Sequence, residues 1–133
     1  MKLVIYTDGG ARGNPGPAGI GVVIGDTYEH GEYIGETTNN VAEYKALVFA
    51  IKKAKSLYKD NLAVLDVEVR MDSELIVKQM KGEYKVKNEG LRPLFLEVQK
   101  LIPSFHHVSF HHIPREKNSR ADALVNKALD AQI

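Results

Sequence analysis

Residues 6–17 read YTDGGARGNPGP, so an aspartate follows an apolar run and leads directly into a turn rich in glycine and proline. The run LVIYT at residues 3–7 is β-branched and aromatic over most of its length, which is typical of a central strand buried on both faces. Functional sites of open α/β sheets gather outside the carboxyl ends of such strands. Asp8, which we expect at the end of this strand, therefore marks a candidate site.

The hydrophobic periodicity predicts further strands and helices along the rest of the chain. The expected strands are residues 19–25, 30–36, 62–71 and 106–113, and the expected helices are residues 39–59, 72–82, 91–102 and 118–133. An asparagine is expected to cap the first helix. The order βββαβααβα combines a meander with crossover connections. We therefore expect an α/β fold with a mixed sheet covered by helices on both faces.

Length and composition indicate a single compact unit. The chain has 133 residues, 44% hydrophobic content and no long linker, which predicts one domain over residues 1–133. The formal net charge of +1 provides no global field, so a polyanionic partner requires a local basic patch. The absence of cysteine excludes disulfides and thiolate metal sites. No run resembles a membrane span or a signal peptide, so we expect a cytoplasmic protein with no membrane partner and no obligate protein partner.

Glu43 heads the core-facing stripe of the predicted helix over residues 39–59. Leu47, Ala50 and Ile51 follow it by four, seven and eight residues, on the same helical face. A charge at this position is costly unless a basic partner or a metal ion compensates for it. The alternative is a glutamate whose stem is buried while its carboxylate reaches solvent.

Two further acids lie where predicted elements begin or end. Asp72 ends a strand and begins a helix, and its alternation groups it with Glu68 and Arg70 rather than with the core. Asp122 lies near the start of the last helix, on the same face as Val125. Taken alone, either acid is explained by the helix dipole, which favours acids in a first turn.

Convergence of Asp8, Glu43, Asp72 and Asp122 would require cations to offset their mutual repulsion. Carboxylate oxygens select hard ions such as Mg²⁺ or Mn²⁺. A pair of such ions about 3.5–4 Å apart activates a water molecule and stabilises the leaving oxygen in phosphodiester cleavage. The four acids would then indicate a nuclease.

Four blocks of the sequence resemble, in order and spacing, the signature blocks of type 1 ribonuclease H. They read YTDGGARGNPGPAG, TTNNVAEYKAL, MDSELIV and NSRADALVNKA, and each carries one of the four acids. The chain looks like the compact members of this family, which lack a basic protrusion helix. The resemblance implies a five-stranded mixed sheet of order 3-2-1-4-5. It also implies hydrolysis of the RNA strand of RNA–DNA hybrids with two Mg²⁺ ions, or with Mn²⁺, leaving 3′-hydroxyl and 5′-phosphate ends.

The resemblance further implies roles for individual residues. The catalytic metal ligands would be Asp8, Glu43, Asp72 and Asp122. The substrate contacts would be Gly9, Gly10, Asn14, Thr38, Asn39, Asn40 and Asn88. Among these, Asn14 and Asn39, together with Glu43, would sense the 2′-hydroxyl that distinguishes RNA from DNA. Asn88 would contact a DNA phosphate, and helix capping is the alternative role for Asn39 and Asn40.

The chain departs from the family pattern at two positions. Many relatives carry glutamine two residues after the third acid, where this chain has Glu74, which adds negative charge near the proposed metals. Many also hold a mobile histidine on the loop before the last acid, and that loop reads HHIPREKNSRAD here. By the resemblance, this histidine assists product release, and Arg115 is the expected replacement here because an arginine can hold the scissile phosphate in a bidentate manner. His112 is one alternative, and a plain salt bridge from Arg115 to an acid is another.

The segment over residues 78–92 carries five basic residues against two acids, an excess of three positive charges near Asn88. This excess predicts a modest phosphate-binding patch. Because the chain resembles family members without the larger basic protrusion, we expect weaker substrate affinity that depends only slightly on salt. Tyr84 within the segment is expected to cover the core rather than to pack against a sugar.

Two rival functions stay open at this point. A hybrid-binding module without catalysis is disfavoured by the presence of all four acids, and Mg²⁺-dependent cleavage would discriminate it. A related nuclease acting on double-stranded RNA or on junction DNA is the second rival, and digestion of different duplexes would separate it.

Overall fold

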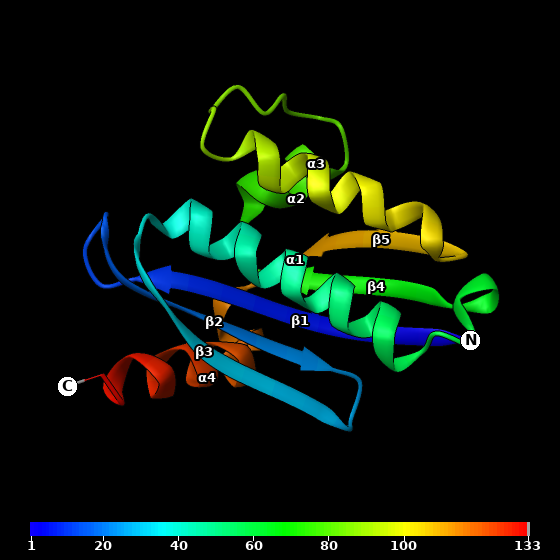
Figure 1. The fold of residues 1–133 in the computed structure, drawn as a ribbon, viewed down its shortest axis with the longest axis horizontal. Helices are drawn as coiled ribbons and strands as arrows, with labels where there is room; N and C mark the ends of the chain where they lie inside the picture. The colour runs from blue at the N-terminus through cyan, green and yellow to red at the C-terminus, as the bar shows by residue number, and fades with distance from the viewer. Residues whose placement is uncertain (133) are drawn as a thin grey trace.

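A computed structural model describes residues 1–132, which contain a five-stranded sheet in the order β3-β2-β1-β4-β5. The antiparallel meander consists of β1 (Lys2–Ala11), β2 (Gly16–Ile24) and β3 (Tyr28–Thr37). The parallel strands beside β1 are β4 (Asp66–Met71) and then β5 (His107–His112), as Figure 1 shows. The predicted mixed sheet and its strand order are confirmed.

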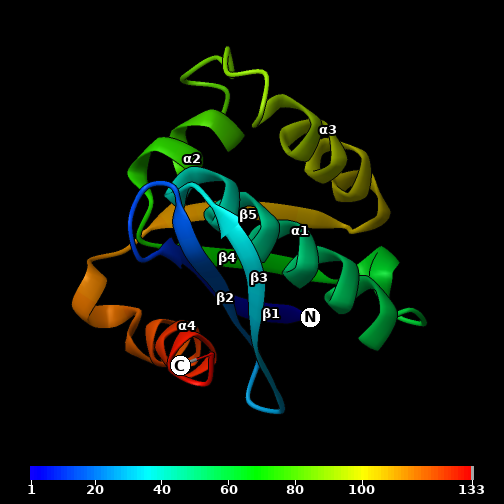
Figure 2. The same ribbon diagram turned by 60° about the vertical axis from the view of Figure 1, so that its left-hand side comes forward.

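Helices cover both faces of the sheet, as predicted. The helices on one face are α1 (Asn39–Leu57), α2 (Glu74–Met80) and α3 (Arg92–Leu101), and the helix on the other face is α4 (Ser119–Asp130) (Figure 2). Ile5 of β1, Leu47 of α1 and Val69 of β4 are fully buried in the core between these layers. In the described part of the chain, no helix has the length and apolar character needed to cross a membrane.

Several element boundaries differ from the predictions for local reasons. The cap of α1 is Thr38, whose Oγ1 accepts a hydrogen bond from the Val41 backbone at 3.3 Å, so the predicted asparagine cap is wrong. Residues 62–64 form a short 3₁₀ helix, and β4 begins only at Asp66. Residue 133, the last of the predicted final helix, lies outside the described residues.

Asp8 does not end its strand. β1 continues to Ala11 because its antiparallel pairing with β2 extends to the pair of Ala11 with Ala18. The parallel pairing with β4 stops earlier, at the pair of Thr7 with Met71. Asp8 is therefore the first residue of β1 that has no partner in β4, although it still pairs with β2. This leaves space beside Asp8 on the β4 side.

Two glycines allow helices to approach the sheet closely beside this point. A Cβ atom on Gly9 would lie 2.3 Å from the carbonyl carbon of Ala42 in α1. A Cβ atom on Gly21, which pairs with Asp8, would lie 2.1 Å from the carbonyl oxygen of Ala121 in α4. Neither distance is possible for a real side chain, so only glycine fits at these positions. Each contacted alanine directly precedes a candidate acid, so the glycines bring those acids to the sheet.

Candidate active site

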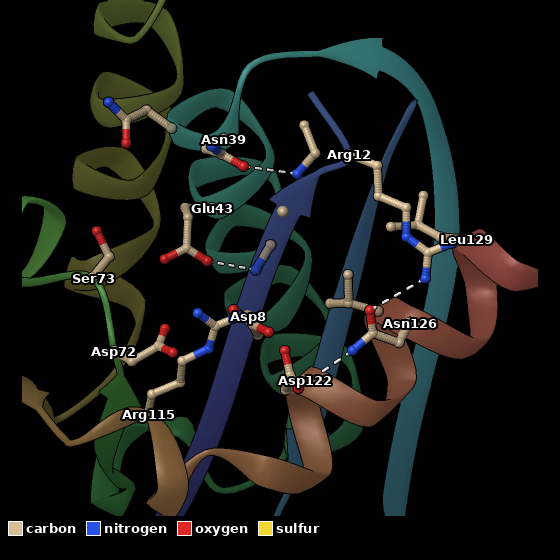
Figure 3. A pocket seen from close by; sticks show the side chains of 15 residues that line it. Asp8, Arg12, Asn39, Glu43, Asp72, Ser73, Arg115, Asp122, Asn126 and Leu129 are labelled. Atoms are coloured by element: carbon tan, nitrogen blue, oxygen red, sulfur yellow. Dashed lines mark hydrogen bonds between the residues drawn. The ribbon is translucent and has the colours of Figure 1, made fainter. Parts of the chain in front are cut away.

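Three carboxylates from three different elements meet where β4 ends (Figure 3). Asp8 comes from β1, Glu43 from the early part of α1, and Asp72 from the residue after β4. One oxygen of each lies within 4.8 Å of the oxygens of the other two. The strand register explains part of this arrangement, because Asp8 and Asp72 directly follow the last parallel pair.

Asp122, the fourth predicted acid, lines the same pocket from α4 (Figure 3). It does not belong to the group whose oxygens all lie within 4.8 Å of one another. Its Oδ2 accepts a hydrogen bond of 3.3 Å from Nδ2 of Asn126, one turn further along the helix. The predicted acids therefore share one pocket, with Asp122 on its α4 side.

Burial and like charge disfavour ionisation of these carboxyl groups. Asp8 is 8% exposed, and burial, reinforced by the charges of Asp72 and Asp122, raises its pKa to about 7. Glu43 is 6% exposed, so its carboxylate does not reach freely into solvent. Burial and the charges of Asp8 and Asp72 raise the pKa of Glu43 well above its usual value. Burial also raises the pKa of Asp72, although Arg115 acts in the opposite direction.

The donor set suits a divalent cation. The backbone N–H of Gly9 donates a 2.5 Å hydrogen bond to Oε1 of Glu43. Within residues 1–132, no lysine or arginine forms a salt bridge with Asp8, Glu43 or Asp72. Arg115 offsets part of the charge of Asp72 without forming a salt bridge, and no basic group is among the causes that shift the pKa of Asp8 or Glu43. Three clustered carboxylates are the type of site that hard, oxygen-seeking ions occupy.

Two asparagines connect the turn after β1 to the start of α1. The Ala11 backbone N–H donates to Oδ1 of Asn39 at 2.8 Å, and the Asn39 backbone N–H donates to Oδ1 of Asn14 at 3.0 Å. Both amide oxygens accept bonds from the backbone, so both side chains present their NH₂ groups as donors. Asn39 lines the pocket, whereas Asn14 lies in the turn after β1 and is not part of the lining.

The other predicted substrate residues lie in and around the same pocket. Those that line it are Gly9, Gly10 and Asn40. Thr38 caps α1 outside the lining, and Asn88 lies in the connector between α2 and α3. Oδ1 of Asn88 accepts hydrogen bonds from the backbones of Gly90 and Leu91 at 2.7 and 3.3 Å. Asn88 therefore also presents its NH₂ group outwards.

Of the two residues that depart from the family pattern, Arg115 lies in the pocket and Glu74 lies outside it. Arg115 lines the pocket and forms no salt bridge with the described residues, so the alternative of a plain salt bridge is not realised there. His112 is exposed at the end of β5 and lies outside the lining. Glu74 is also exposed outside the lining, where it forms a 2.8 Å salt bridge with Lys78.

Sequence reasoning missed three polar residues of the pocket: Arg12, Ser73 and Asn126. Nη2 of Arg12 lies 2.8 Å from Oδ1 of Asp130 and 3.4 Å from Oδ1 of Asn126. The turn after β1 is therefore joined to α4, and Figure 3 shows the bond to Asn126. Asn126 follows Asp122 by four residues on one helical face, and this spacing was the available signal.

The interpretation of Tyr84 as a core residue is wrong. Its side chain is 48% exposed, and Nζ of Lys78 lies 5.1 Å from its ring centroid. The connector therefore presents an aromatic ring beside a basic group on the surface.

The amino-acid sequence is similar to those of known proteins over most of its length. Residues 6–128 match the family described as reverse transcriptase-like. The bifunctional protein Rv2228c of Mycobacterium tuberculosis is 44% identical over 138 residues, which is 98% of this chain and 36% of that protein. Ribonuclease HI of Halobacterium salinarum is 42% identical over 134 residues, which is 97% of this chain and 65% of that protein. The chain thus spans about a third of the length of Rv2228c and just under two thirds of the length of the Halobacterium salinarum enzyme.

Solved structures resemble the chain over nearly its whole length. The crystal structure of LC11-RNase H1 in complex with an RNA/DNA hybrid is 54% identical, with a TM-score of 0.92 and 98% of both chains covered. LC11-RNase H1 was isolated from compost by a metagenomic approach.

The raised pKa of Asp8 predicts a pH-dependent cost to stability in the absence of divalent ions. The folded pKa of about 7 exceeds the usual value of 3.8. At low pH Asp8 is protonated in both the folded and the unfolded protein and does not lower the free energy of unfolding. As the pH rises between these two values, the unfolded protein loses this proton more readily, so the free energy of unfolding falls. We expect Asp8→Asn to unfold like the wild type near about pH 4, and to be more stable by about 1–4 kcal/mol near about pH 8.

Chemical denaturation in EDTA across this range measures the effect. The exposed-turn variant Asp60→Asn is the control and should follow the wild type at each pH. A constant stability difference between Asp8→Asn and wild type at all pH values would contradict the prediction.

Proposed function

Since the chain belongs to the reverse transcriptase-like family and, within it, to the ribonucleases H, we propose that it is a metal-dependent endoribonuclease that hydrolyses the RNA strand of RNA–DNA hybrids. The observation that carries this proposal is the convergence of Asp8, Glu43 and Asp72, none of which forms a salt bridge within residues 1–132. The hybrid in the complex of LC11-RNase H1 supports the choice of substrate. We assign the activity to a single domain over residues 1–133, and a cytoplasmic location stays a prediction.

Asp8, Glu43 and Asp72 would hold two Mg²⁺ ions, with Asp122 as a further ligand and Mn²⁺ as an alternative ion. Such ions, when bound, activate a water molecule and stabilise the leaving oxygen, giving 3′-hydroxyl and 5′-phosphate ends. The raised pKa values of Asp8 and Glu43 favour their protonated forms, so binding of cations to these carboxylates would release protons. The hydrogen bond from Gly9 to Glu43 holds that carboxylate in place.

Recognition of the RNA strand is proposed to rest on complementary donors and acceptors. A 2′-hydroxyl group both donates and accepts hydrogen bonds. Asn14 and Asn39 present NH₂ groups because their oxygens are used within the protein. Glu43 lines the same pocket as Asn39 and adds carboxylate oxygens, which can accept the hydroxyl hydrogen. DNA lacks this hydroxyl group and would leave these residues without a partner.

The DNA strand is proposed to lie toward the connector between α2 and α3. The NH₂ group of Asn88 points outwards as a phosphate donor, and Thr38 and Asn40 lie at the start of α1. The exposed ring of Tyr84, beside Lys78, offers a surface against which a sugar or base can pack. With a local excess of only about three positive charges, we expect weak binding that falls with salt.

A panel of labelled substrates tests the proposed function. With Mg²⁺ we expect cleavage of the RNA strand of a hybrid, no cleavage in EDTA, and loss of cleavage in Asp8→Asn. Double-stranded RNA, duplex DNA and junction DNA are digested in parallel, because cleavage of any of these in preference to the hybrid would identify the rival nuclease. Tight hybrid binding without cleavage in either Mg²⁺ or Mn²⁺ would identify a binding module and refute the proposal.

Asn39→Asp separates recognition from folding. An aspartate has the same shape and still accepts the bond from Ala11, but it presents an acceptor where the substrate needs a donor. We expect KM for the hybrid to rise on the order of 10- to 100-fold, with the unfolding curve little changed.

Asn61→Asp introduces the same charge change at an exposed position whose side chain forms no capping bond, and it is the matched control. An unchanged KM in Asn39→Asp would show that this amide does not read the substrate.

Arg115→Ala tests the arginine of the pocket. Because Arg115 supplies one electrostatic contact to the scissile phosphate, its loss should slow turnover on the order of 10- to 1,000-fold, less than the loss of a carboxylate. Lys117→Ala, in the same 3₁₀ turn but outside the pocket lining, should retain wild-type turnover. A loss as complete as that of Asp8→Asn would make Arg115 essential, and no loss would remove it from the mechanism.

A further inference from the structure

Asn118 occupies an unusual position at the start of α4. It is the N-cap residue of this helix, yet its side chain forms no capping hydrogen bond. Asparagine is favoured at N-caps because its side chain accepts bonds from the first turn. Here the side chain turns inward instead, and the residue is 1% exposed. Helix capping therefore does not explain the asparagine.

The buried amide reaches the central strand beside the acids. Nδ2 of Asn118 donates a 2.9 Å hydrogen bond to the carbonyl oxygen of Thr7. That carbonyl belongs to the peptide unit that joins Thr7 to Asp8, and it lies where β4 ends at Met71. The bond therefore fixes the peptide plane that carries Asp8, at the point where the parallel strand no longer supports it.

The backbone of Asn118 extends the same connection to two other pocket residues. Its N–H donates to the carbonyl of Arg115 at 3.0 Å, and its carbonyl accepts from the N–H of Asp122 at 3.1 Å. Through Asn118, the start of α4 is joined to β1 and to the 3₁₀ turn that holds Arg115.

Stability alone does not account for this side chain. Oδ1 of Asn118 is buried and has no hydrogen-bond partner among the described residues. An unpaired buried acceptor lowers stability, so the bond from Nδ2 to the Thr7 carbonyl is formed at a cost that offsets part of its stabilising effect.

We propose that Asn118 is a positioning residue of the metal site, which holds Asp122 and Arg115 in register with the Thr7–Asp8 peptide of β1. This inference rests on the proposed function, because it assigns the metal site to Asp8 and its neighbours. Residues that orient metal ligands without touching the metal typically change metal affinity or activity on the order of 10- to 100-fold when substituted.

Asn118→Leu in the full chain tests the proposal, because leucine has a similar volume and fills the space without an amide. Two readouts are required: the Mg²⁺ and Mn²⁺ concentrations that half-saturate the rise in unfolding temperature, and kcat and KM on a labelled hybrid. We expect the half-saturating metal concentration to rise and kcat to fall, each on the order of 10- to 100-fold, with KM changed only a few-fold.

Gln79→Leu is the matched control. Gln79 is also a buried amide, 5% exposed, and its Oε1 accepts a 2.6 Å bond from Tyr44, away from the pocket lining. Its loss should lower the unfolding temperature and leave the metal response and kcat as in the wild type.

The metal response and kcat of Asn118→Leu, compared with those of Gln79→Leu, decide whether Asn118 positions the metal site. A folded Asn118→Leu with a wild-type metal response and kcat overturns the proposal, as does a loss that Gln79→Leu reproduces. If leucine prevents folding, Asn118→Ser is measured in the same way and judged by the same criteria. A wild-type protein that binds metal but cleaves no hybrid refutes the proposed function alone, since the metal titration still tests Asn118.

Discussion

The mutual repulsion of buried carboxylates at the end of β4 is the constraint around which the site is arranged. Asp8 and Glu43 are almost fully buried, and burial raises the pKa of both. The charge of Asp72 raises both pKa values further, and the charge of Asp8 raises that of Glu43. An ordinary fold avoids such a cluster or pairs it with basic groups. Here the cluster is held together by the backbone of the surrounding elements, which is what a cation site requires.

The surrounding fold keeps the acids together despite that repulsion. Gly9 and Gly21 remove the side chains that would separate α1 and α4 from the sheet. The early end of β4 leaves room for Asp72 beside Asp8, in the register that the parallel pairing sets. Most of these contacts involve backbone atoms, so the positions of the acids depend on the packing of whole elements rather than on flexible side chains.

The sequence predicted the element order, and resemblance to the ribonuclease H family predicted the strand order and the four acids. Periodicity and turn residues predict the element order, because apolar residues recur at strand or helix spacing between turn-forming residues. Periodicity could not predict that β1 continues past Asp8, since this depends on how far β2 pairs with it. It also could not predict the exposure of Tyr84 or the inward turn of Asn118, because both depend on neighbours distant in sequence. The cap at Thr38 rather than at an asparagine reflects a choice among adjacent cap-forming residues that local propensity does not resolve.

The central claim is that these separate carboxylates form one cation site. Anomalous scattering from crystals grown with Mn²⁺ tests it most directly. The account predicts anomalous density between the side-chain oxygens of Asp8, Glu43 and Asp72, and its loss in crystals of Asp8→Asn. Crystals in which Mn²⁺ binds elsewhere, or leaves this pocket without density at saturating concentration, would contradict it.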